Sequence, residues 1–412
     1  MTLRSTPPRE RAKAIMEFYQ VKKGRITLSG RPVHLKGVNL GGWLMPEAYF
    51  MHAPNRGHRF FRDRFILELG EKAYAEIEKA FRDNFIREDD FKRIAVMGFN
   101  HVRLPFHYEL IETKPFSYAK SGLKYLEQAV AWGKKHGVGI ILDMHAVPGA
   151  QNHDWHSDSD GRMLFYSSKE YQQRAIALWH LIAERFKNEP AVIGYDILNE
   201  TVIPDAAPMN AYYRAAIAAI RTVDRRHIIF TEGNRWAQDI DCLEDFEDEN
   251  LVFGIHFYEP LELTFNFVPG LSYPLLGGKK PWDKSFMRQR LELSVAVARK
   301  RGRALWCGEC GVNARDGKYG EDRYVADMLA NFKALDIHWT YWTWKAVKNS
   351  IFPDGINSYY PNDPWINRAG PVSGWDTWAA QWPKNRKAMI ASWRTDKFSL
   401  NKPVAGALSR AL

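Results

Sequence analysis

The chain has 412 residues, 45% of them hydrophobic and 26% charged, so it can bury a large core as ordinary globular proteins do. Its 58 basic and 48 acidic residues give a formal net charge of +10, but the basic residues are dispersed, and no nucleic acid partner is expected. Three cysteines are too few for a disulfide framework, and the lack of any uncharged apolar segment of about 18 residues argues against a membrane span.

The N-terminal segment, residues 1–23, is predicted to be a charged and partly helical lead-in to a single domain over residues 24–412. It has no apolar stretch typical of a signal peptide, so a cytoplasmic location is expected by default. Residues 26–40 alternate apolar and polar side chains around the turn dipeptide Ser29-Gly30. This pattern predicts a small β-hairpin that leads into a first strand.

The rest of the chain alternates short apolar segments with segments of helical periodicity. After the first strand, further strands are predicted over residues 100–104, 138–143, 191–197, 227–231, 251–258, 303–309 and 337–344, and helices over residues 72–97, 121–135, 168–187, 209–223, 286–300, 323–334 and 375–393. Eight strands with such crossovers predict an α/β fold, the (β/α)8 or TIM barrel. A doubly wound sheet is the alternative, but residues 37–42 lack the glycine spacing of a phosphate-binding turn.

Three predicted connections are unusually long and rich in Pro, Gly, Trp and Tyr: residues 43–70, 259–283 and 345–374. Loops of that length in a compact domain are usually functional or disordered, and their aromatic content argues against disorder. We expect them at the C-terminal face of the barrel, where aromatic rings can stack on sugars.

Two glutamates each follow a predicted strand: Glu200 ends residues 191–200, and Glu309 ends residues 303–309. Cleavage of a glycosidic bond needs such a pair, one carboxyl group to protonate the leaving oxygen and one carboxylate to attack or stabilise the sugar cation. A single strand-end glutamate can equally face solvent. Other polar strand ends strengthen the functional interpretation.

The predicted rim also collects Arg103, His145, Asn199, His256, Tyr258 and a tryptophan of the last strand. Burying several charges on one rim costs free energy unless they pair, so stability alone explains the group poorly. We expect Glu309 to be a nucleophile kept ionised by Arg103 and Tyr258, and Glu200 to be the acid/base with its pKa lifted by the nearby anion. Asn199 is expected to hold a sugar 2-hydroxyl, and His145 and His256 to brace carboxylates and sugar hydroxyls. The residues alone leave the direction of this assignment open.

The pair Cys307 and Cys310 has a redox-like spacing but lies inside a predicted strand rather than at a helix start. We interpret both residues as buried strand thiols. A zinc site would need more sulfur or nitrogen ligands.

Six motifs along the chain, over about residues 33–344, resemble glycoside hydrolase family 5 in content and order. They are Val38-Asn-Leu-Gly-Gly-Trp43, Gly98-Phe-Asn-His-Val-Arg-Leu-Pro105, Leu142-Asp-Met-His145, Leu198-Asn-Glu200, His256-Phe-Tyr258 and Gly308-Glu309. The resemblance implies a retaining β-glycosidase with Glu200 as acid/base and Glu309 as nucleophile, without metal or cofactor. The family's tryptophan after the eighth strand best matches Trp342, with Trp344 as a rival.

Within that family, the segment Asn39–Trp43 followed by Glu47, and the segment His145–Asn152, resemble the exo-β-1,3-glucanase branch. In that branch, the counterpart of Glu47 and an aspartate beyond the Gln-Asn pair hold the terminal glucose. This chain departs from the branch because the aspartate beyond Asn152, Asp154, stands one position early. The expected partner is an oligo- or polysaccharide, and the expected state is a monomer.

We expect the substrate to be a β-glucan or a β-glucoside, with another β-glycan specificity of the same family (mannan, a glycolipid or transglycosylation) as the alternative. Two other classes remain open. A metal-dependent barrel hydrolase is suggested by Asp143, His145, His256 and Glu309 on strand ends, and it predicts inactivation by a chelator. A sugar-binding pseudoenzyme is the other, although both glutamates are present.

Overall fold

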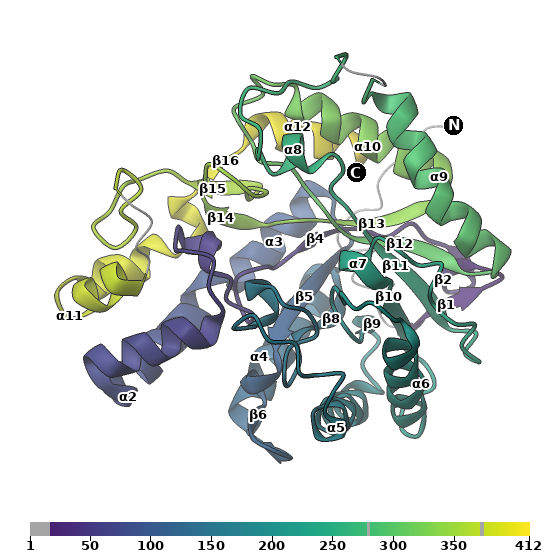
Figure 1. Cartoon of the computed structure of the whole chain (residues 1–412), viewed down its shortest axis with the longest axis horizontal. Helices are drawn as coiled ribbons and strands as arrows, with labels where there is room; N and C mark the ends of the chain where they lie inside the picture. Colours follow the sequence, from purple (N-terminus) through teal and green to yellow (C-terminus); the bar gives the residue numbers. More distant parts are fainter. Residues whose placement is uncertain (1–16, 278–280, 371–374) are drawn as a thin grey trace.

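The computed structural model describes residues 17–277, 281–370 and 375–412, and its centre is a closed barrel of eight strands (Figure 1). The barrel strands are β4 (Lys36–Asn39), β5 (His101–His107), β8 (Gly139–Ala146), β9 (Val192–Asp196), β10 (Ile228–Glu232), β11 (Leu251–Phe257), β12 (Ala304–Cys310) and β13 (Ile337–Tyr341). Every neighbouring pair is parallel, and β13 closes the barrel against β4. The predicted (β/α)8 barrel is confirmed.

Long helices surround the barrel. They are α2 (His58–Phe85), α3 (Glu88–Met97), α4 (Lys120–His136), α5 (Lys169–Phe186), α6 (Ala207–Arg221), α9 (Lys284–Lys300), α10 (Glu321–Leu335), α11 (Trp375–Ser392) and α12 (Lys402–Ala411). In α5 the Ser168 hydroxyl caps the first turn by accepting from the Tyr171 amide at 3.3 Å, and Leu178, Trp179 and Ile182 are buried at helical spacing. Within the described residues, the β10–β11 connection holds only the four-residue α7 (Asn234–Ala237).

A small antiparallel sheet closes the N-terminal end of the barrel. Its strands are β1 (Tyr19–Lys22), β2 (Arg25–Leu28) and β3 (Arg31–Pro32). Ile26 and Leu35 pack against the interior side chains Phe230 and Trp306. The hairpin is confirmed, but the helical lead-in is wrong for β1, which pairs with β2; residues 1–16 lie outside the described part. Because this end is filled, ligand access is from the C-terminal end.

All three of the predicted long connections contain regular structure. Helix α2 already begins at His58 and bends at Gly70, whose φ of 84° is non-helical. Strands β14 (Lys345–Val347) and β15 (Asn357–Tyr359) form a second small sheet with β16 (Ser399–Leu400), while residues 371–374 are outside the described part. The segment 259–283 holds only α8 (Leu261–Thr264), and residues 278–280 are likewise not described.

The last barrel strand is shorter than predicted. It ends at Tyr341 rather than residue 344, because the amide of Trp342 turns to the carbonyl of Cys310 and that of Trp344 to the carbonyl of Asn39. Cys307 and Cys310 are buried, unpaired thiols of β12, as predicted.

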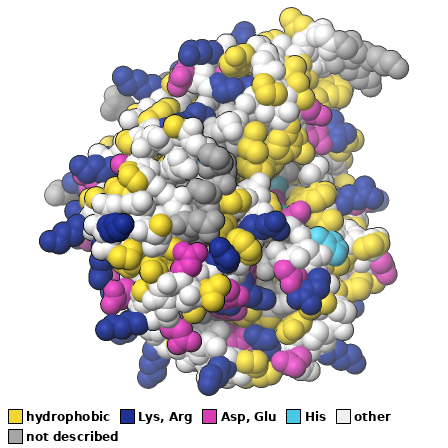
Figure 2. Space-filling view, turned by 60° about the vertical axis from the view of Figure 1, so that its left-hand side comes forward, with side chains coloured by type: hydrophobic (Ala, Val, Ile, Leu, Met, Phe, Trp, Pro, Cys, Tyr) yellow, Lys and Arg dark blue, Asp and Glu magenta, His cyan; other side chains and the backbone are white. Residues whose placement is uncertain are grey.

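Charged side chains are spread over the surface. On the face in Figure 2, Lys and Arg alternate with Asp and Glu, and the described residues drawn there form no continuous basic stripe. Hydrophobic side chains gather in groups between them. In the described ranges, no helix combines the length and hydrophobicity that crossing a membrane requires.

Candidate active site

The sequence-predicted polar residues meet at the C-terminal end of the barrel. Arg103 lies on β5, His145 on β8, Asn199 and Glu200 just after β9, His256 on β11, Tyr258 just after it, and Glu309 on β12. A register shift in β11 before His256 places this residue opposite Glu309. Parallel strands of a closed barrel all end on one rim, and bulges there re-aim side chains into a site.

Arg103 is the fully buried centre of this group. Its Nη1 donates to Glu309 Oε1 at 2.6 Å, and its Nε donates to Asp196 Oδ2 at 2.8 Å. Its Nη2 donates to Asn199 Oδ1 at 2.7 Å and to Glu232 Oε1 at 3.0 Å. One rigid guanidinium therefore sets the relative positions of side chains from β9, β10 and β12.

The ionisable groups around Arg103 differ in the direction of their pKa shifts. Burial opposes the charged form of Arg103, but the surrounding carboxyl groups, Asp143 first, hold its pKa well above the ordinary value. Burial, followed by repulsion from Glu232, raises the pKa of Asp196 well above its usual range, although Arg103 opposes this shift. Burial would also raise the pKa of Glu232, but the charge and hydrogen bond of His256 lower it to about 2. A higher proton affinity at one acid limits the electrostatic cost of the cluster.

Glu309 is held through both of its carboxylate oxygens. Oε1 accepts from Arg103, and Oε2 accepts from the Tyr258 hydroxyl at 2.9 Å. The residue is buried yet borders the cleft. Such contacts fix one orientation of the carboxylate.

Glu200 stands on strained backbone. Its φ of 44° is left-handed, a conformation that costs non-glycine residues free energy and persists only when neighbours enforce it. Glu232 Oε2 accepts from the Glu200 amide at 2.8 Å, and Asn152 Nδ2 donates to the Glu200 carbonyl at 2.8 Å. Both hydrogen bonds involve backbone atoms of Glu200, and they leave its carboxylate oriented toward the cleft.

Two histidines flank the Glu200 carboxylate. His256 Nδ1 is 2.5 Å from Oε1, and His156 Nδ1 is 3.5 Å from Oε2. Burial would raise the pKa of Glu200, but the charge and hydrogen bond of His256 outweigh it and lower that pKa. The expectation that the neighbouring anion lifts this pKa is wrong, because the imidazolium lies closer to Glu200.

His256 shares a proton with Glu200. Burial opposes its charge, but Glu232, Glu309 and Glu200 raise its pKa well above the ordinary value. Its other nitrogen, Nε2, is 2.9 Å from Glu232 Oε1. A single proton therefore lies in the short hydrogen bond between His256 and Glu200 and belongs to the pair rather than to either residue.

His145, Trp342 and Glu47 form one wall beside the carboxylates. His145 Nδ1 is 2.8 Å from Asp143 Oδ2, and its ring stacks on Trp342 at 5.6 Å between centroids. Glu47 Oε1 is 3.6 Å from His145 Nε2. Burial first, then Glu309 and Glu200, raise the pKa of Glu47 well above its usual range, and Glu47 borders the cleft.

The two candidate tryptophans separate clearly. Trp342 borders the cleft and donates its indole N–H to the Tyr49 hydroxyl at 2.6 Å. Trp344 is 1% exposed and donates to Asp90 Oδ1 at 2.8 Å, behind the barrel wall. Only Trp342 can reach a ligand.

Both predicted asparagines are fully buried, and neither is among the residues that line the cleft. Asn199 Nδ2 lies 3.5 Å from His145 Nε2, beside the carboxylates. Asn152 is fully buried; its Oδ1 accepts from the Asp154 amide at 2.8 Å, while its Nδ2 holds the Glu200 carbonyl. Asn152 therefore supports the loop and does not face the cleft.

Glu232, Asp196 and His156 were not among the site residues predicted from the sequence. Glu232 and Asp196 each end a barrel strand, so the strand-end criterion that selected Glu309 would also have found them. His156 lies in a loop, and its approach to Glu200 depends on the loop path, for which no local pattern exists.

Two groups of side chains have the spacing of metal ligands. In the first, Glu200, His256 and Glu309, one ligand atom from each lies within 4.8 Å of the others. Both ring nitrogens of His256 face carboxylates, and its raised pKa keeps both protonated, so this histidine has no lone pair for a metal.

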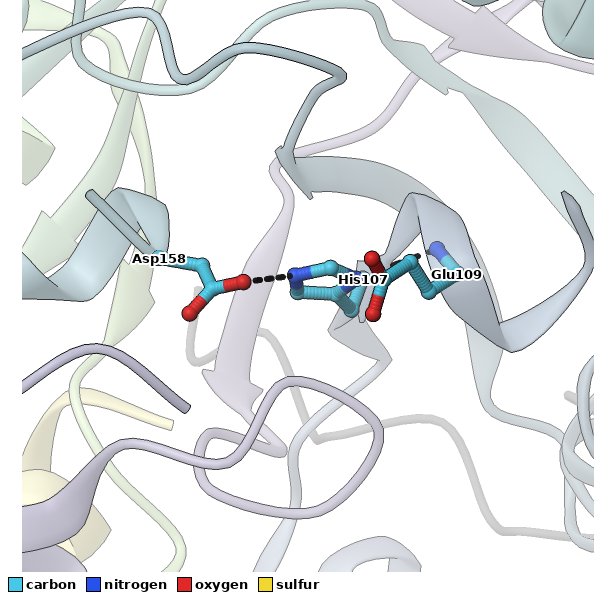
Figure 3. Close-up of side chains that lie close together, drawn as sticks. All are labelled: His107, Glu109 and Asp158. Carbon is cyan, nitrogen blue, oxygen red and sulfur yellow. Dashed lines mark hydrogen bonds and ion pairs between the residues drawn. The ribbon is translucent and has the colours of Figure 1, made fainter. Parts of the chain in front are cut away.

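The second group is His107, Glu109 and Asp158 (Figure 3). His107 Nε2 is 3.0 Å from Asp158 Oδ2. Arg62 Nη1 donates to Glu109 at 2.7 Å, and Arg59 Nη2 lies 3.5 Å from Asp158. Guanidinium groups already compensate these carboxylates, so neither donor set fits a metal ion.

The cleft above the carboxylates has a volume of about 840 Å³ and mainly apolar walls. Its aromatic lining consists of Tyr49, Trp155, Trp236, Tyr258, Phe265, Trp282, Phe286, Trp342 and Phe352. Aromatic faces beside a few convergent polar groups are typical of sites that bind sugar rings.

Comparison with known proteins points to one family. Residues 71–348 match the model of Cellulase (glycosyl hydrolase family 5). The chain is 31% identical to a β-xylosidase of Phanerodontia chrysosporium over 77% of this chain and 68% of that protein. It is 26% identical to Endoglucanase C of Acetivibrio thermocellus over 77% of this chain and 92% of that protein.

The fold has close counterparts among solved structures. Endoglucanase Cel5A of Thermotoga maritima superposes with a TM-score of 0.61 at 19% identity, covering 98% of this chain and all of that chain. At that identity the likeness concerns the fold.

Proposed function

Because this chain belongs to glycosyl hydrolase family 5, we propose that it cleaves β-glycosidic bonds in β-glucans or β-glucosides by double displacement. The observation that carries the proposal is the approach of Glu200 and Glu309, with carboxylate oxygens within 4.8 Å. Carboxyl groups of retaining glycosidases lie about 5–5.5 Å apart, whereas inverting pairs need about 6.5–9.5 Å to admit a water molecule.

In the first step, Glu309 attacks the anomeric carbon and the bond to the leaving oxygen breaks. Glu200 gives that oxygen the proton it shares with His256 over 2.5 Å. Arg103 and Tyr258 hold the attacking carboxylate in place. The product of this step is a glycosyl ester on Glu309 and a free alcohol.

In the second step, Glu200 removes a proton from water, and the water oxygen attacks the same carbon. The bond to Glu309 breaks, so the anomeric configuration returns to that of the substrate. The short hydrogen bond to His256 takes up the proton again.

The sugar at the cleaved bond is expected to stack on Trp342. Asn199, whose Nδ2 lies 3.5 Å from His145 Nε2, is proposed to bind its 2-hydroxyl, and Glu47, which borders the cleft, to bind a further hydroxyl. Asn152, which the exo-glucanase resemblance suggested as a sugar ligand, is proposed to act through the Glu200 backbone instead.

Product stereochemistry tests the mechanism. We expect NMR to detect the β-anomer as the first product from a β-glucoside, and an α-anomer first product would overturn the proposal. Glu309→Gln should reduce turnover below detection, while Glu170→Gln on the outer helix α5 keeps the wild-type rate. Turnover that survives in Glu309→Gln, or that a chelator abolishes, would favour a metal-dependent hydrolase.

The preferred polymer can be determined by a screen. Laminarin, carboxymethylcellulose, mannan and aryl β-glycosides, including an aryl β-xyloside, separate the linkages and sugars named for the matched relatives. We expect the highest kcat/KM on a β-glucosidic substrate.

A further inference from the structure

His156 approaches the acid/base from a loop rather than from a barrel strand. It lies in the short helix η3 (Trp155–Ser157), between β8 and α5. Its Nδ1 is 3.5 Å from Glu200 Oε2, and its Nε2 is 3.6 Å from Asp154 Oδ2. Because His256 faces Oε1, each oxygen of the Glu200 carboxylate faces an imidazole ring of its own. The proton that Glu200 gives away is shared with His256, which leaves the contact with His156 unexplained.

The loop that carries this histidine is held at both ends. At its start, Asn152 Nδ2 donates to the Glu200 carbonyl, and Asn152 Oδ1 accepts from the Asp154 amide, both at 2.8 Å. At its end, Asp158 Oδ1 accepts from an amide in the first turn of α2 at 2.7 Å. The loop therefore has a fixed position relative to the backbone of the acid/base.

The side chains around the imidazole also restrict its orientation. Asp154 Oδ2 accepts from the Trp236 indole N–H at 2.8 Å, so the carboxylate that faces the ring is itself held. The side chain of His156 is 14% exposed. Its ring packs edge to face against Trp155 and against the titratable ring of His145, with centroids 5.7 and 6.4 Å away.

The neighbours of His156 favour its protonated form. Burial opposes a charge on the ring, but Asp154 at one nitrogen and Glu200 at the other raise the pKa of His156 above its ordinary value. Glu309 on β12 acts in the same direction. Burial would raise the pKa of Glu200, but the charges of His256 and then His156 lower it.

We propose that His156 is a positioning residue for the acid/base, whose cation, held by Asp154, stabilises the carboxylate that forms on Glu200 when the leaving oxygen is protonated. This inference rests on the proposed function. In that step the proton passes to the leaving oxygen, and negative charge appears on Glu200, 3.5 Å from His156 Nδ1. A fixed cation lowers the free energy of such an anion. The contribution matters only where the leaving group has to be protonated.

The test compares two aryl β-glucosides that differ only in the leaving group. 2,4-Dinitrophenolate departs without a proton, whereas phenolate, a much stronger base, needs one, and kcat/KM covers all steps through departure of either. His156→Asn replaces the imidazole with an uncharged amide. At pH 5 we expect it to lower kcat/KM about tenfold on the phenyl glucoside and by less than about twofold on the dinitrophenyl glucoside.

The effect of His156→Asn should depend on pH. With its raised pKa, the ring is charged at low pH and loses its charge as pH rises through that pKa. On the phenyl glucoside, the ratio of wild-type to variant kcat/KM should fall from about ten at pH 5 toward one as pH rises to about 9. Asp154→Asn keeps an acceptor for the Trp236 indole but removes a charge that favours the cation, so in this background the ratio should reach one at lower pH.

A double-mutant cycle determines whether the effect passes through the acid/base. In Glu200→Gln, which has no proton to give, adding His156→Asn should change the residual rate on the phenyl glucoside by less than about twofold. His153→Asn is the matched control, because this exposed histidine lies in the same loop, with its Nδ1 3.0 Å from the Gly161 carbonyl. It should leave the rates on both glucosides at the wild-type level.

The outcomes separate this inference from the proposed function. Equal losses on the two glucosides, no loss on the phenyl glucoside, a ratio that does not change with pH, or a full tenfold loss in Glu200→Gln would each overturn the role of His156. Failure of the wild-type enzyme to release dinitrophenolate overturns the proposed function itself.

Discussion

At the scale of single residues, the site depends on how buried charges are shared. Arg103 contacts Asp143, Asp196, Glu232 and Glu309 between 2.6 and 3.1 Å. One guanidinium and one imidazolium cannot offset all of these acids together with Glu200. The raised pKa of Asp196 favours its uncharged form, and His256 and Glu200 share a proton. Proton affinity in this site is therefore a property of the cluster.

Glu232→Gln tests whether His256 and Glu200 share a proton whose affinity depends on the neighbouring charges. Among the charges that raise the pKa of His256, Glu232 contributes the most, so its removal weakens the hold of the His256–Glu200 pair on its proton. The pair then deprotonates at lower pH, and the alkaline limb of the kcat/KM profile moves to lower pH. We expect about a tenfold lower kcat/KM at mildly alkaline pH, measured from pH 4 to 10.

The control for this prediction is Glu247→Gln, which removes a negative charge from an exposed loop between β10 and β11. Its profile should match that of the wild-type enzyme. An alkaline limb that is unchanged in Glu232→Gln, or that moves to higher pH, would contradict the shared-proton description.

At the scale of elements, the first turn of helix α2 is capped by a residue that is distant in the sequence. Its N-cap position is Gly57, which has no side chain to bond the first amides. Asp158 performs this task from another loop, because its Oδ1 accepts from the Arg59 amide at 2.7 Å and its Oδ2 faces His107 at 3.0 Å. The cluster in Figure 3 is thus a tertiary helix cap that joins α2 to the end of β5.

We expect Asp158→Ala to destabilise the protein by about 2 kcal/mol, since it removes a helix cap and leaves the buried His107 without its partner. Asp158→Asn keeps an acceptor for the Arg59 amide and should cost less. Urea unfolding measures both, and Asp160→Ala, at an exposed pair with Arg162, should change stability by less than about 0.5 kcal/mol. Equal stability of the Asp158 and Asp160 variants would refute the cap.

At the scale of the whole molecule, buried neutral histidines link stability to pH. His338 is buried between β13 and the segment before β4, and its Nδ1 accepts from the Leu35 amide at 3.1 Å. Burial first, then His34, lowers the pKa of His338 to about 3. Burial, followed by His338 and His34, also lowers the pKa of His101 to about 3.

These shifts predict lower stability in acid. The unfolded chain protonates each histidine near pH 6.5, but the folded protein resists protonation down to about pH 3. The stability present above pH 6.5 is therefore lost as pH falls, by about 2 kcal/mol per histidine between pH 7 and 5. In His338→Asn the amide oxygen can still accept the hydrogen bond from the Leu35 amide. Urea unfolding at pH 7 and pH 5 should show that this variant loses about 2 kcal/mol less stability between the two pH values than the wild-type protein does.

His180→Asn, at an exposed position of α5, is the control and should retain the wild-type pH dependence. If His338→Asn loses as much stability as the wild-type protein between pH 7 and 5, His338 does not cause the loss of stability in acid.

Sequence alone was sufficient for the barrel and for the two glutamates. Apolar segments that alternate with amphipathic helices allow few folds, and parallel closure brings every strand end to one rim. Glu200 and Glu309 therefore had to meet although 108 residues lie between them in the chain. Arg103, His256 and Tyr258 followed from the same rule.

Local patterns failed where a contact comes from elsewhere in the chain. The start of α2 was missed because its cap, Asp158, lies 99 positions away from Arg59. Trp342 and Trp344 share one strand face in a period-two pattern, but β13 ends at Tyr341, and the two rings then diverge. The pKa of Glu200 was predicted in the wrong direction, because only side-chain geometry brings His256 closer than Glu309.

What the sequence by itself determined is therefore the set of strand-end residues, since hydrophobic periodicity and parallel closure depend on residue order alone. The tertiary structure decided which of those groups carry protons, that His156 and Trp236 join the cleft, and that Asn152 supports Glu200 from behind. These outcomes depend on distances of a few ångströms between loops and on the exclusion of water, and neither quantity is encoded in any single segment.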